Sequence, residues 1–213
     1  MRTRIKICGI TTPDDALGAA TAGADAIGLI CYPPSPRFVA PARAREITNA
    51  VPPFVTRVAV FVNPTESDVG AVIEAAQIDM LQFHGDEDPV FCAAFGVPYL
   101  KAARMRPDLD LLEYLAPYIS AAGWLLDTYR DDRYGGIGAA FDWGLIPNGL
   151  ARPIILSGGL EIANVREGVQ RIHPWAVDVS SGVEAERNGA IVKGEKDHLK
   201  IARFVAEVRN AES

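Results

Sequence analysis

Cysteine and histidine are scarce in this sequence. Its 213 residues contain three of each, and the cysteines Cys8, Cys31 and Cys92 are odd in number, widely spaced and free of any CxxC pair. This pattern argues against a disulfide framework and a structural zinc site, and it favours a reducing compartment. With so few histidines, we expect no His-rich metal centre either.

The sequence also lacks an excess of positive charge and any long apolar run. The formal net charge is -6 and the isoelectric point is about 5.1, so there is no basic footprint for nucleic acid or an anionic membrane. No apolar run is long enough to span a bilayer, and residues 11–15 interrupt the basic start before any apolar segment follows. We therefore expect a cytoplasmic protein with no membrane or nucleic-acid partner. An anionic ligand would have to be bound by local geometry.

What the sequence does contain is a regular alternation of apolar and Ala-rich segments. The segments between the apolar runs begin with helix-start signals at Thr12, Pro64 and Glu161, and a last helix is expected from about Asp197 to Arg209. No linker or low-complexity segment appears, so we expect residues 1–213 to form one domain. The apolar runs, typical of strands buried on both faces of a parallel sheet, are Arg4–Cys8, Ala26–Cys31, Arg57–Val62, Met80–Phe83, Tyr99–Ala102, Trp124–Asp127, Pro153–Ser157 and Ala176–Ser180.

Two folds fit eight strands that alternate with helices, a compact (β/α)8 barrel and a doubly wound open sheet. No GxGxxG follows the first strand, the units are of similar length, and glycine and polar residues gather after strands. Two long loops, 32–39 and 129–141, also follow strands, where barrels build their active sites. We therefore predict an α/β fold, a single-domain (β/α)8 TIM barrel.

Turns rich in glycine and serine follow the last two strand runs. Gly158 and Gly159 end the seventh run, and Ser180, Ser181 and Gly182 end the eighth. Tight turns that use glycine for positive φ are common without any ligand. However, barrels often hold a phosphate after strands seven and eight, on backbone N–H groups. We predict a phosphate site at the carboxyl ends of these two strands.

Five further side chains are candidates for chemistry. Cys8 ends the first run, His84 follows the fourth, Asp127 closes the sixth and Asp178 lies in the eighth, while Arg37 stands in a proline-stiffened loop and offers a planar fork suited to a carboxylate. We consider His84 and Asp178 as substrate contacts. Each side chain also has an ordinary structural alternative. Cys8 could be a buried thiol, His84 a hydrogen-bonded wall residue and Asp127 a capping carboxylate. Asp178 could brace the phosphate loop, and Arg37 could be a solvated surface arginine.

Short motifs follow one another along the sequence. They are Lys6–Thr11, Ser35–Arg37, Phe61–Asn63, Gln82–Glu87, Leu126–Thr128, Gly135–Trp143, Leu156–Leu160 and Val177–Glu184, with Lys196–Asp197 beyond. Taken in order, these motifs are similar to those of the phosphoribosylanthranilate isomerase family of tryptophan biosynthesis. The similarity extends over essentially the whole chain, and as a set the motifs are highly specific.

The resemblance implies an Amadori rearrangement of a phosphorylated small molecule, the aminoaldose N-(5'-phosphoribosyl)anthranilate, to an aminoketose without metal or cofactor. It implies that Asp127 is the general acid, which protonates the ribose ring oxygen, and that Cys8 is the general base, which removes the C2' proton. Arg37 would engage the anthranilate carboxylate, and the two Gly/Ser turns the phosphate. For these roles we expect Asp127 to hold a proton near neutrality and the pKa of Cys8 to be lowered.

Three features depart from the family pattern. Ile137 replaces a usual threonine in the Gly-rich loop, the segment 184–195 looks longer than usual, and Cys31 precedes the proline loop. None of them involves the expected acid or base, and protein partners are not specified by the sequence.

Other functions fit less well. The related sugar-phosphate isomerase of histidine synthesis uses aspartates at the ends of strands one and five, where this chain has Cys8 and Lys101–Ala103. A metal-dependent pentose-phosphate epimerase would need histidines and acids after strands two to four, where His84 is the available histidine. A catalytically silent phosphate-binding barrel would have lost Cys8 or Asp127, and both are present.

Overall fold

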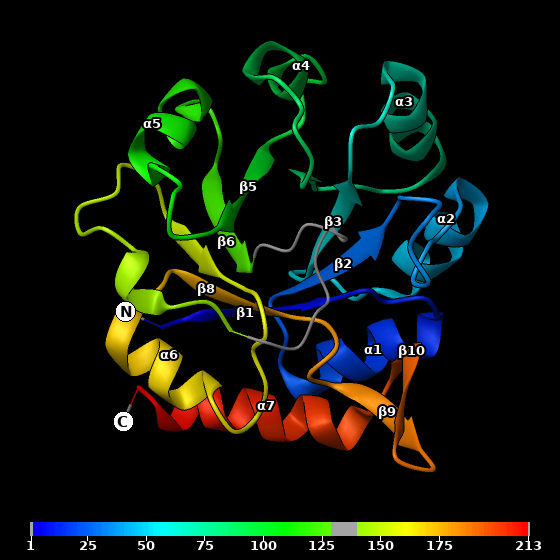
Figure 1. The fold of residues 1–213 in the computed structure, drawn as a ribbon. Coiled ribbons are helices and arrows are strands. Elements are labelled where there is room, and N and C mark those ends of the chain that lie inside the picture. Colours follow the sequence, from blue (N-terminus) through cyan, green and yellow to red (C-terminus); the bar gives the residue numbers. More distant parts are fainter. Residues whose placement is uncertain (1, 129–139, 213) are drawn as a thin grey trace.

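Eight parallel strands close into a barrel in the computed structural model, which describes residues 2–128 and 140–212 (Figure 1). The strands pair in chain order, and β8 pairs with β1. The predicted (β/α)8 barrel is confirmed. The strands are β1 Arg4–Cys8, β2 Ala26–Ile30, β3 Thr56–Phe61, β4 Met80–Phe83, β5 Tyr99–Met105, β6 Gly123–Thr128, β7 Ile154–Leu156 and β8 Ala176–Val179.

Helices surround the barrel. The predicted starts hold for the first and last of them, because Thr12 and Asp197 cap these two helices with their side chains. The sixth α-helix begins at Val165 rather than Glu161, since the Asn164 side chain accepts the Glu161 N–H and holds a turn there. The helices are α1 Pro13–Ala22, α2 Pro41–Ala50, α3 Glu66–Ala75, α4 Pro89–Ala93, α5 Leu111–Leu115, α6 Val165–Ile172 and α7 His198–Asn210, with 3₁₀ turns at Ala116–Tyr118 and Trp143–Leu145.

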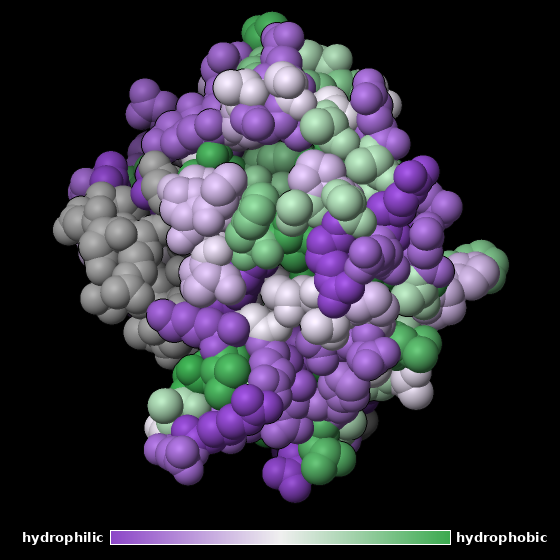
Figure 2. Space-filling view, turned by 90° about the vertical axis from the view of Figure 1, so that its right-hand side faces the viewer, coloured by the Kyte–Doolittle hydropathy of each residue, from purple (hydrophilic) through white to green (hydrophobic). Residues whose placement is uncertain are grey.

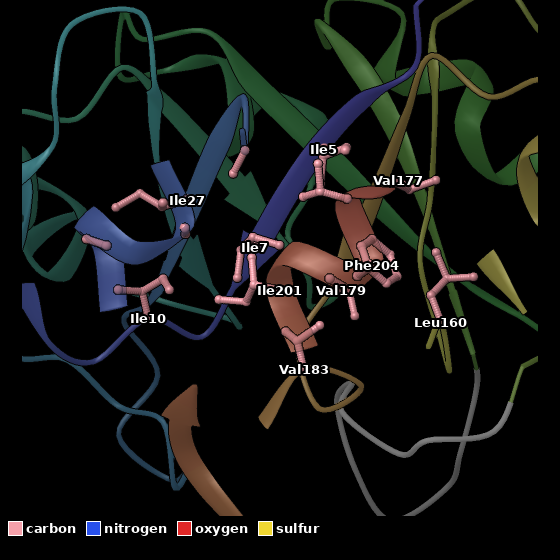
Figure 3. Close-up of a cluster of buried hydrophobic side chains, with 14 of the residues drawn as sticks. Ile5, Ile7, Ile10, Ile27, Leu160, Val177, Val179, Val183, Ile201 and Phe204 are labelled. Atoms are coloured by element: carbon pink, nitrogen blue, oxygen red, sulfur yellow. The ribbon is translucent and has the colours of Figure 1, made fainter. Parts of the chain in front are cut away.

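The outer face of the barrel is held by apolar packing against the helices. Ile5 and Ile7 of β1 lie beside Ile201 and Phe204 of α7, and all four side chains are fully buried (Figure 3). Full burial of one such side chain contributes about 1.5–3 kcal/mol. Because successive strand residues point to opposite faces, the outward packing of Ile5 and Ile7 directs their neighbours on β1 into the barrel.

The barrel interior is apolar near the amino ends of the strands and polar near their carboxyl ends. The apolar part is filled by a cluster of Leu100, Ala102, Leu125, Ile155 and Ala176. Polar side chains, among them Gln82, Asp127 and Asp178, lie nearer the carboxyl ends of the strands.

The segment 184–195 forms an antiparallel hairpin beyond β8, a feature that the sequence had left open (Figure 1). Its strands are β9 Glu184–Arg187 and β10 Ala190–Lys196. The connecting Asn188 and Gly189 both have positive φ, as a two-residue type I′ turn requires.

Among the described residues, no helix is both long and apolar enough to cross a membrane.

Candidate active site

A pocket of about 730 Å³, counting its open mouth, lies at the carboxyl ends of the strands. Figure 2 views the molecule from the side toward which β1 and β2 run in Figure 1, and it shows a hollow near the centre. Of the predicted site residues, those that line the pocket are Cys8, Arg37, His84, Asp127, Gly158, Gly159, Asp178, Ser180 and Ser181.

The predicted acid is held in place by two neighbours. Asp127, at the end of β6, is buried and accepts the backbone N–H of Thr128 on Oδ1 at 2.8 Å. Its Oδ2 lies 2.9 Å from Nε2 of His84. The carboxyl group is therefore fixed in orientation at the pocket wall.

His84 is itself fixed by a residue one layer deeper. Gln82 Nε2 lies 3.0 Å from His84 Nδ1, and both side chains are buried. Because an amide nitrogen only donates, Nδ1 accepts, and a neutral ring then carries its hydrogen on Nε2. His84 is thus a hydrogen-bonded wall residue, and its contact with a substrate stays a prediction.

Cys8 lies buried among charged groups. Burial raises the pKa of its thiol, the charges of Lys6 and Lys196 oppose that shift, and the carboxylate of Asp178 adds to it. The net direction is upward. The predicted lowering of the Cys8 pKa is therefore wrong, because the two ammonium groups do not outweigh the loss of hydration.

Arg37 is buried rather than solvated. Its Nε and Nη2 donate to the two carboxylate oxygens of Glu184, at 2.6 and 2.7 Å. Glu184 also accepts the N–H of Gly194. Although burial alone raises the pKa of Glu184, the hydrogen bond from Arg37 and the charge of Lys196 bring it below its ordinary value. The fork is thus occupied by Glu184, and a contact of Arg37 with a substrate carboxylate stays a prediction.

The two Gly/Ser turns meet at the pocket. Gly158 has a φ of 78°, and a Cβ there would lie 2.5 Å from the amide nitrogen of Thr128, so the backbone needs glycine. The hydroxyl of Ser180 is buried and has no hydrogen-bond partner within the described ranges. Gly182 lies outside the pocket lining and forms a bridge with Glu161 that joins the two turns.

Comparison with known proteins identifies the family. The family profile described as N-(5'phosphoribosyl)anthranilate (PRA) isomerase matches residues 5–207. The chain belongs to this family. It is 51% identical to the N-(5'-phosphoribosyl)anthranilate isomerase of Nitrosospira multiformis over all of both chains, and 54% identical to that of Pseudomonas paraeruginosa over 97% of this chain and 95% of the relative.

Solved structures agree with the assignment to the isomerase family. The phosphoribosyl anthranilate isomerase of Thermotoga maritima superposes with a TM-score of 0.86 at 39% identity, covering 98% of this chain and 99% of that one. A second isomerase structure, in complex with reduced 1-(o-carboxyphenylamino)-1-deoxyribulose 5-phosphate, gives a TM-score of 0.82 at 38% identity with the same coverage.

Several buried polar residues of this isomerase chain were not predicted from its sequence. Lys6 interrupts the first apolar run and points into the barrel, and Gln82 does the same in the fourth run. A charged or amide residue between two apolar neighbours of a buried strand is the signal that identifies both positions. Glu184 and Lys196 carried no such signal, because the hairpin that brings them together was not predicted.

Ile137 and most of the loop 129–141 fall outside the described residues. Within residues 2–128 and 140–212, no group of three or more His, Cys, Asp or Glu side chains is placed to hold a metal ion.

Proposed function

We propose that this chain carries out the reaction of its family, the isomerisation of N-(5'-phosphoribosyl)anthranilate in tryptophan biosynthesis, with Cys8 as general base and Asp127 as general acid. The observation that carries the proposal is that these two side chains, from β1 and β6, are buried and line the same pocket. Each positioned proton-transfer group typically contributes ~10²–10⁴-fold in rate.

The first step opens the sugar ring. Asp127 gives its proton to the ring oxygen as the C1'–oxygen bond breaks, and the anthranilate nitrogen forms a double bond to C1'. The contacts of Asp127 with Thr128 and His84 hold the carboxyl group in one orientation. Less conformational freedom of this side chain is therefore lost when the substrate binds.

The second step moves a hydrogen from C2'. The thiolate of Cys8 takes the C2' proton, and the electron pair left behind forms the C1'–C2' double bond of an enolamine while the nitrogen regains its lone pair. Tautomerisation, in which C1' gains a proton and the C2' hydroxyl loses one, yields the ketone. Because the pKa of Cys8 is raised, the side chain rests as a thiol near neutrality and must lose its proton before this step.

Binding is assigned to the rest of the pocket wall. The turns at Gly158–Gly159 and Ser180–Gly182 would hold the phosphate on backbone N–H groups, as is common after the last strands of barrels. Asp178 would meet a substrate hydroxyl, and the Nη1 edge of Arg37, which takes no part in the pair with Glu184, would face the anthranilate carboxylate.

The test is the loss of anthranilate fluorescence when purified protein is added to fresh phosphoribosylanthranilate in the presence of EDTA. We expect loss well above the uncatalysed rate and formation of the aminoketose. A folded protein that binds the reduced product analogue but leaves the fluorescence unchanged would instead be a silent phosphate-binding barrel. A rate restored only by added metal ions would contradict the metal-free mechanism.

A further inference from the structure

A buried ion pair lies inside the barrel beneath the pocket. Lys6 Nζ is 2.9 Å from Asp178 Oδ2, and each side chain is 5% exposed. The two residues are register partners on the adjacent strands β1 and β8. Asp178 Oδ1 is buried and has no hydrogen-bond partner in the part of the chain described. Apolar side chains of similar volume often stabilise a fold as well as such a pair does, so stability alone does not explain the pair.

The ammonium group lies next to the reactive sulfur. Lys6 and Cys8 are two residues apart on β1 and so point to the same side of the strand. A Cβ placed on Gly28 of β2 would lie 2.8 Å from Cys8 Sγ and 3.1 Å from Lys6 Cε. Glycine at this position therefore leaves the space in which the thiol and the lysine stem lie together.

The charged groups facing Cys8 are Lys6, Asp178 and Lys196. Lys196 is committed elsewhere, since its Nζ donates to the Ser180 carbonyl at 3.0 Å and lies 3.5 Å from Glu184. Burial also lowers the pKa of Lys196 to about 8, which weakens its positive charge at and above that pH. Lys6 is different, because Asp178 and Cys8 raise its pKa above the ordinary value despite burial. Lys6 is thus the permanent cation beside the sulfur.

We propose that Lys6 is a positioning residue that stabilises the thiolate form of Cys8, and that Asp178 is the counter-ion that limits how much of the Lys6 charge reaches the sulfur. This inference rests on the proposed role of Cys8 as general base. It assigns Asp178 a function in the free enzyme that does not depend on a substrate hydroxyl. The two members of the pair then act on Cys8 in opposite directions.

The test is the rate at which iodoacetamide alkylates Cys8, measured against pH by mass spectrometry of the Cys8 peptide. Burial raises the pKa of Cys31 and that of Cys92 to about 12, and peptide resolution separates both from Cys8. We expect Lys6→Met to raise the pKa of Cys8 and to slow alkylation about tenfold at neutral pH, since one pKa unit is a tenfold change in thiolate fraction. Asp178→Asn should lower that pKa and speed alkylation. Lys6→Arg should restore most of the wild-type rate.

A matched control is available in a second buried lysine. Lys101 is fully buried and pairs with Glu87 at 2.8 Å, yet it does not belong to the groups that face Cys8. Lys101→Met should therefore leave the alkylation profile of Cys8 unchanged even if it destabilises the fold. If Lys6→Met fails to fold, the double variant Lys6→Met/Asp178→Leu removes both charges at once. Lys6 lowers the pKa of Cys8 more than Asp178 raises it. Removing both charges should therefore raise this pKa, so the double variant should also slow alkylation.

The outcomes are distinct. Opposite shifts for Lys6→Met and Asp178→Asn support the proposal. Shifts in the same direction, no shift, or an equal shift in Lys101→Met would overturn it and reduce the pair to a structural element. Alkylation reads the thiol itself, so the result holds whether or not Cys8→Ala abolishes turnover. Turnover retained in Cys8→Ala would contradict the base assignment alone.

Discussion

His84 Nε2 lies 2.9 Å from Asp127 Oδ2, so an imidazole is in direct contact with the predicted general acid. The histidine comes from the end of β4 and is held by Gln82 on the same strand. The imidazole therefore packs against the carboxyl group and restricts how it lies at the pocket wall. The resulting chain of Gln82, His84 and Asp127 resembles the way in which catalytic groups elsewhere are oriented by a second residue.

His84→Leu should lower kcat more than it changes binding. The variant removes the partner of Asp127 while keeping an apolar wall. We expect kcat to fall about 10–10²-fold, less than the ~10²–10⁴-fold that a whole proton-transfer group contributes, because Asp127 itself remains. Inhibition by inorganic phosphate should be unchanged, because the phosphate turns are untouched. Gln82→Leu should have a weaker effect of the same kind. A large loss of phosphate affinity with unchanged kcat would show that His84 acts only in binding.

Gly158→Ala should damage both stability and turnover. A Cβ at this position would lie 2.5 Å from Thr128 N and 2.8 Å from Asp127 Oδ1, with φ at 78°. Gly149→Ala is the matched control, since its φ is 75° and no neighbouring atom of residues 2–128 and 140–212 lies within 4 Å of the added Cβ. Both variants carry the cost of a left-handed alanine, about 1–2 kcal/mol. Only Gly158→Ala should also lose activity, and equal activity losses in steady-state assays would contradict the close-packing argument.

Much of the fold could be predicted because its signals are local. The apolar run Arg4–Cys8, the cap at Thr12 and the start of the last helix near Asp197 are each predicted from a few neighbouring residues, and the structure confirms them. The end of a strand is less certain, and β5 continues to Met105 beyond its predicted end at Ala102. Register on the next strand, rather than local sequence, sets such ends.

The residues that line the site could be predicted from the sequence, but the side chains with which they form ion pairs and hydrogen bonds could not. That Cys8 and Asp127 reach one pocket follows from strand ends and the barrel fold. The pairing of Arg37 with Glu184 joins residues 147 positions apart and depends on a hairpin whose packing no local pattern reveals. The same holds for the direction of the Cys8 pKa, which is set by burial and by charges from three separate segments.

Glu184→Gln should reduce the loss of stability in acid. The pKa of Glu184 in the folded chain lies below its ordinary value of 4.5. The ionised carboxylate therefore stabilises the fold above about pH 4.5, and this contribution disappears as the pH falls through the lower folded value. Urea unfolding at pH 7 and pH 3.5 should show a smaller difference for the variant than for the wild type. An unchanged difference would mean that other carboxylates control acid unfolding.

Arg37→Lys should raise KM for the anthranilate substrate. Lysine lacks the planar fork, so it cannot serve Glu184 and a second carboxylate from different edges. We expect KM to rise about tenfold, the effect of roughly one lost hydrogen bond to a charged group. A product analogue with a phenyl in place of the carboxyphenyl group should bind wild type and variant equally. Weaker binding of that analogue to the variant would assign Arg37 to pocket structure instead.

The most direct test of the account compares Cys8→Ala, Asp127→Asn and the double variant in the fluorescence assay, with circular dichroism to verify folding. If the two residues are base and acid of one reaction, each single variant loses about 10²–10⁴-fold in kcat. The double variant then falls no further than the product of the two losses, and less if the residues act as a unit. Wild-type turnover in either folded single variant would contradict the central claim that Cys8 and Asp127 transfer the protons.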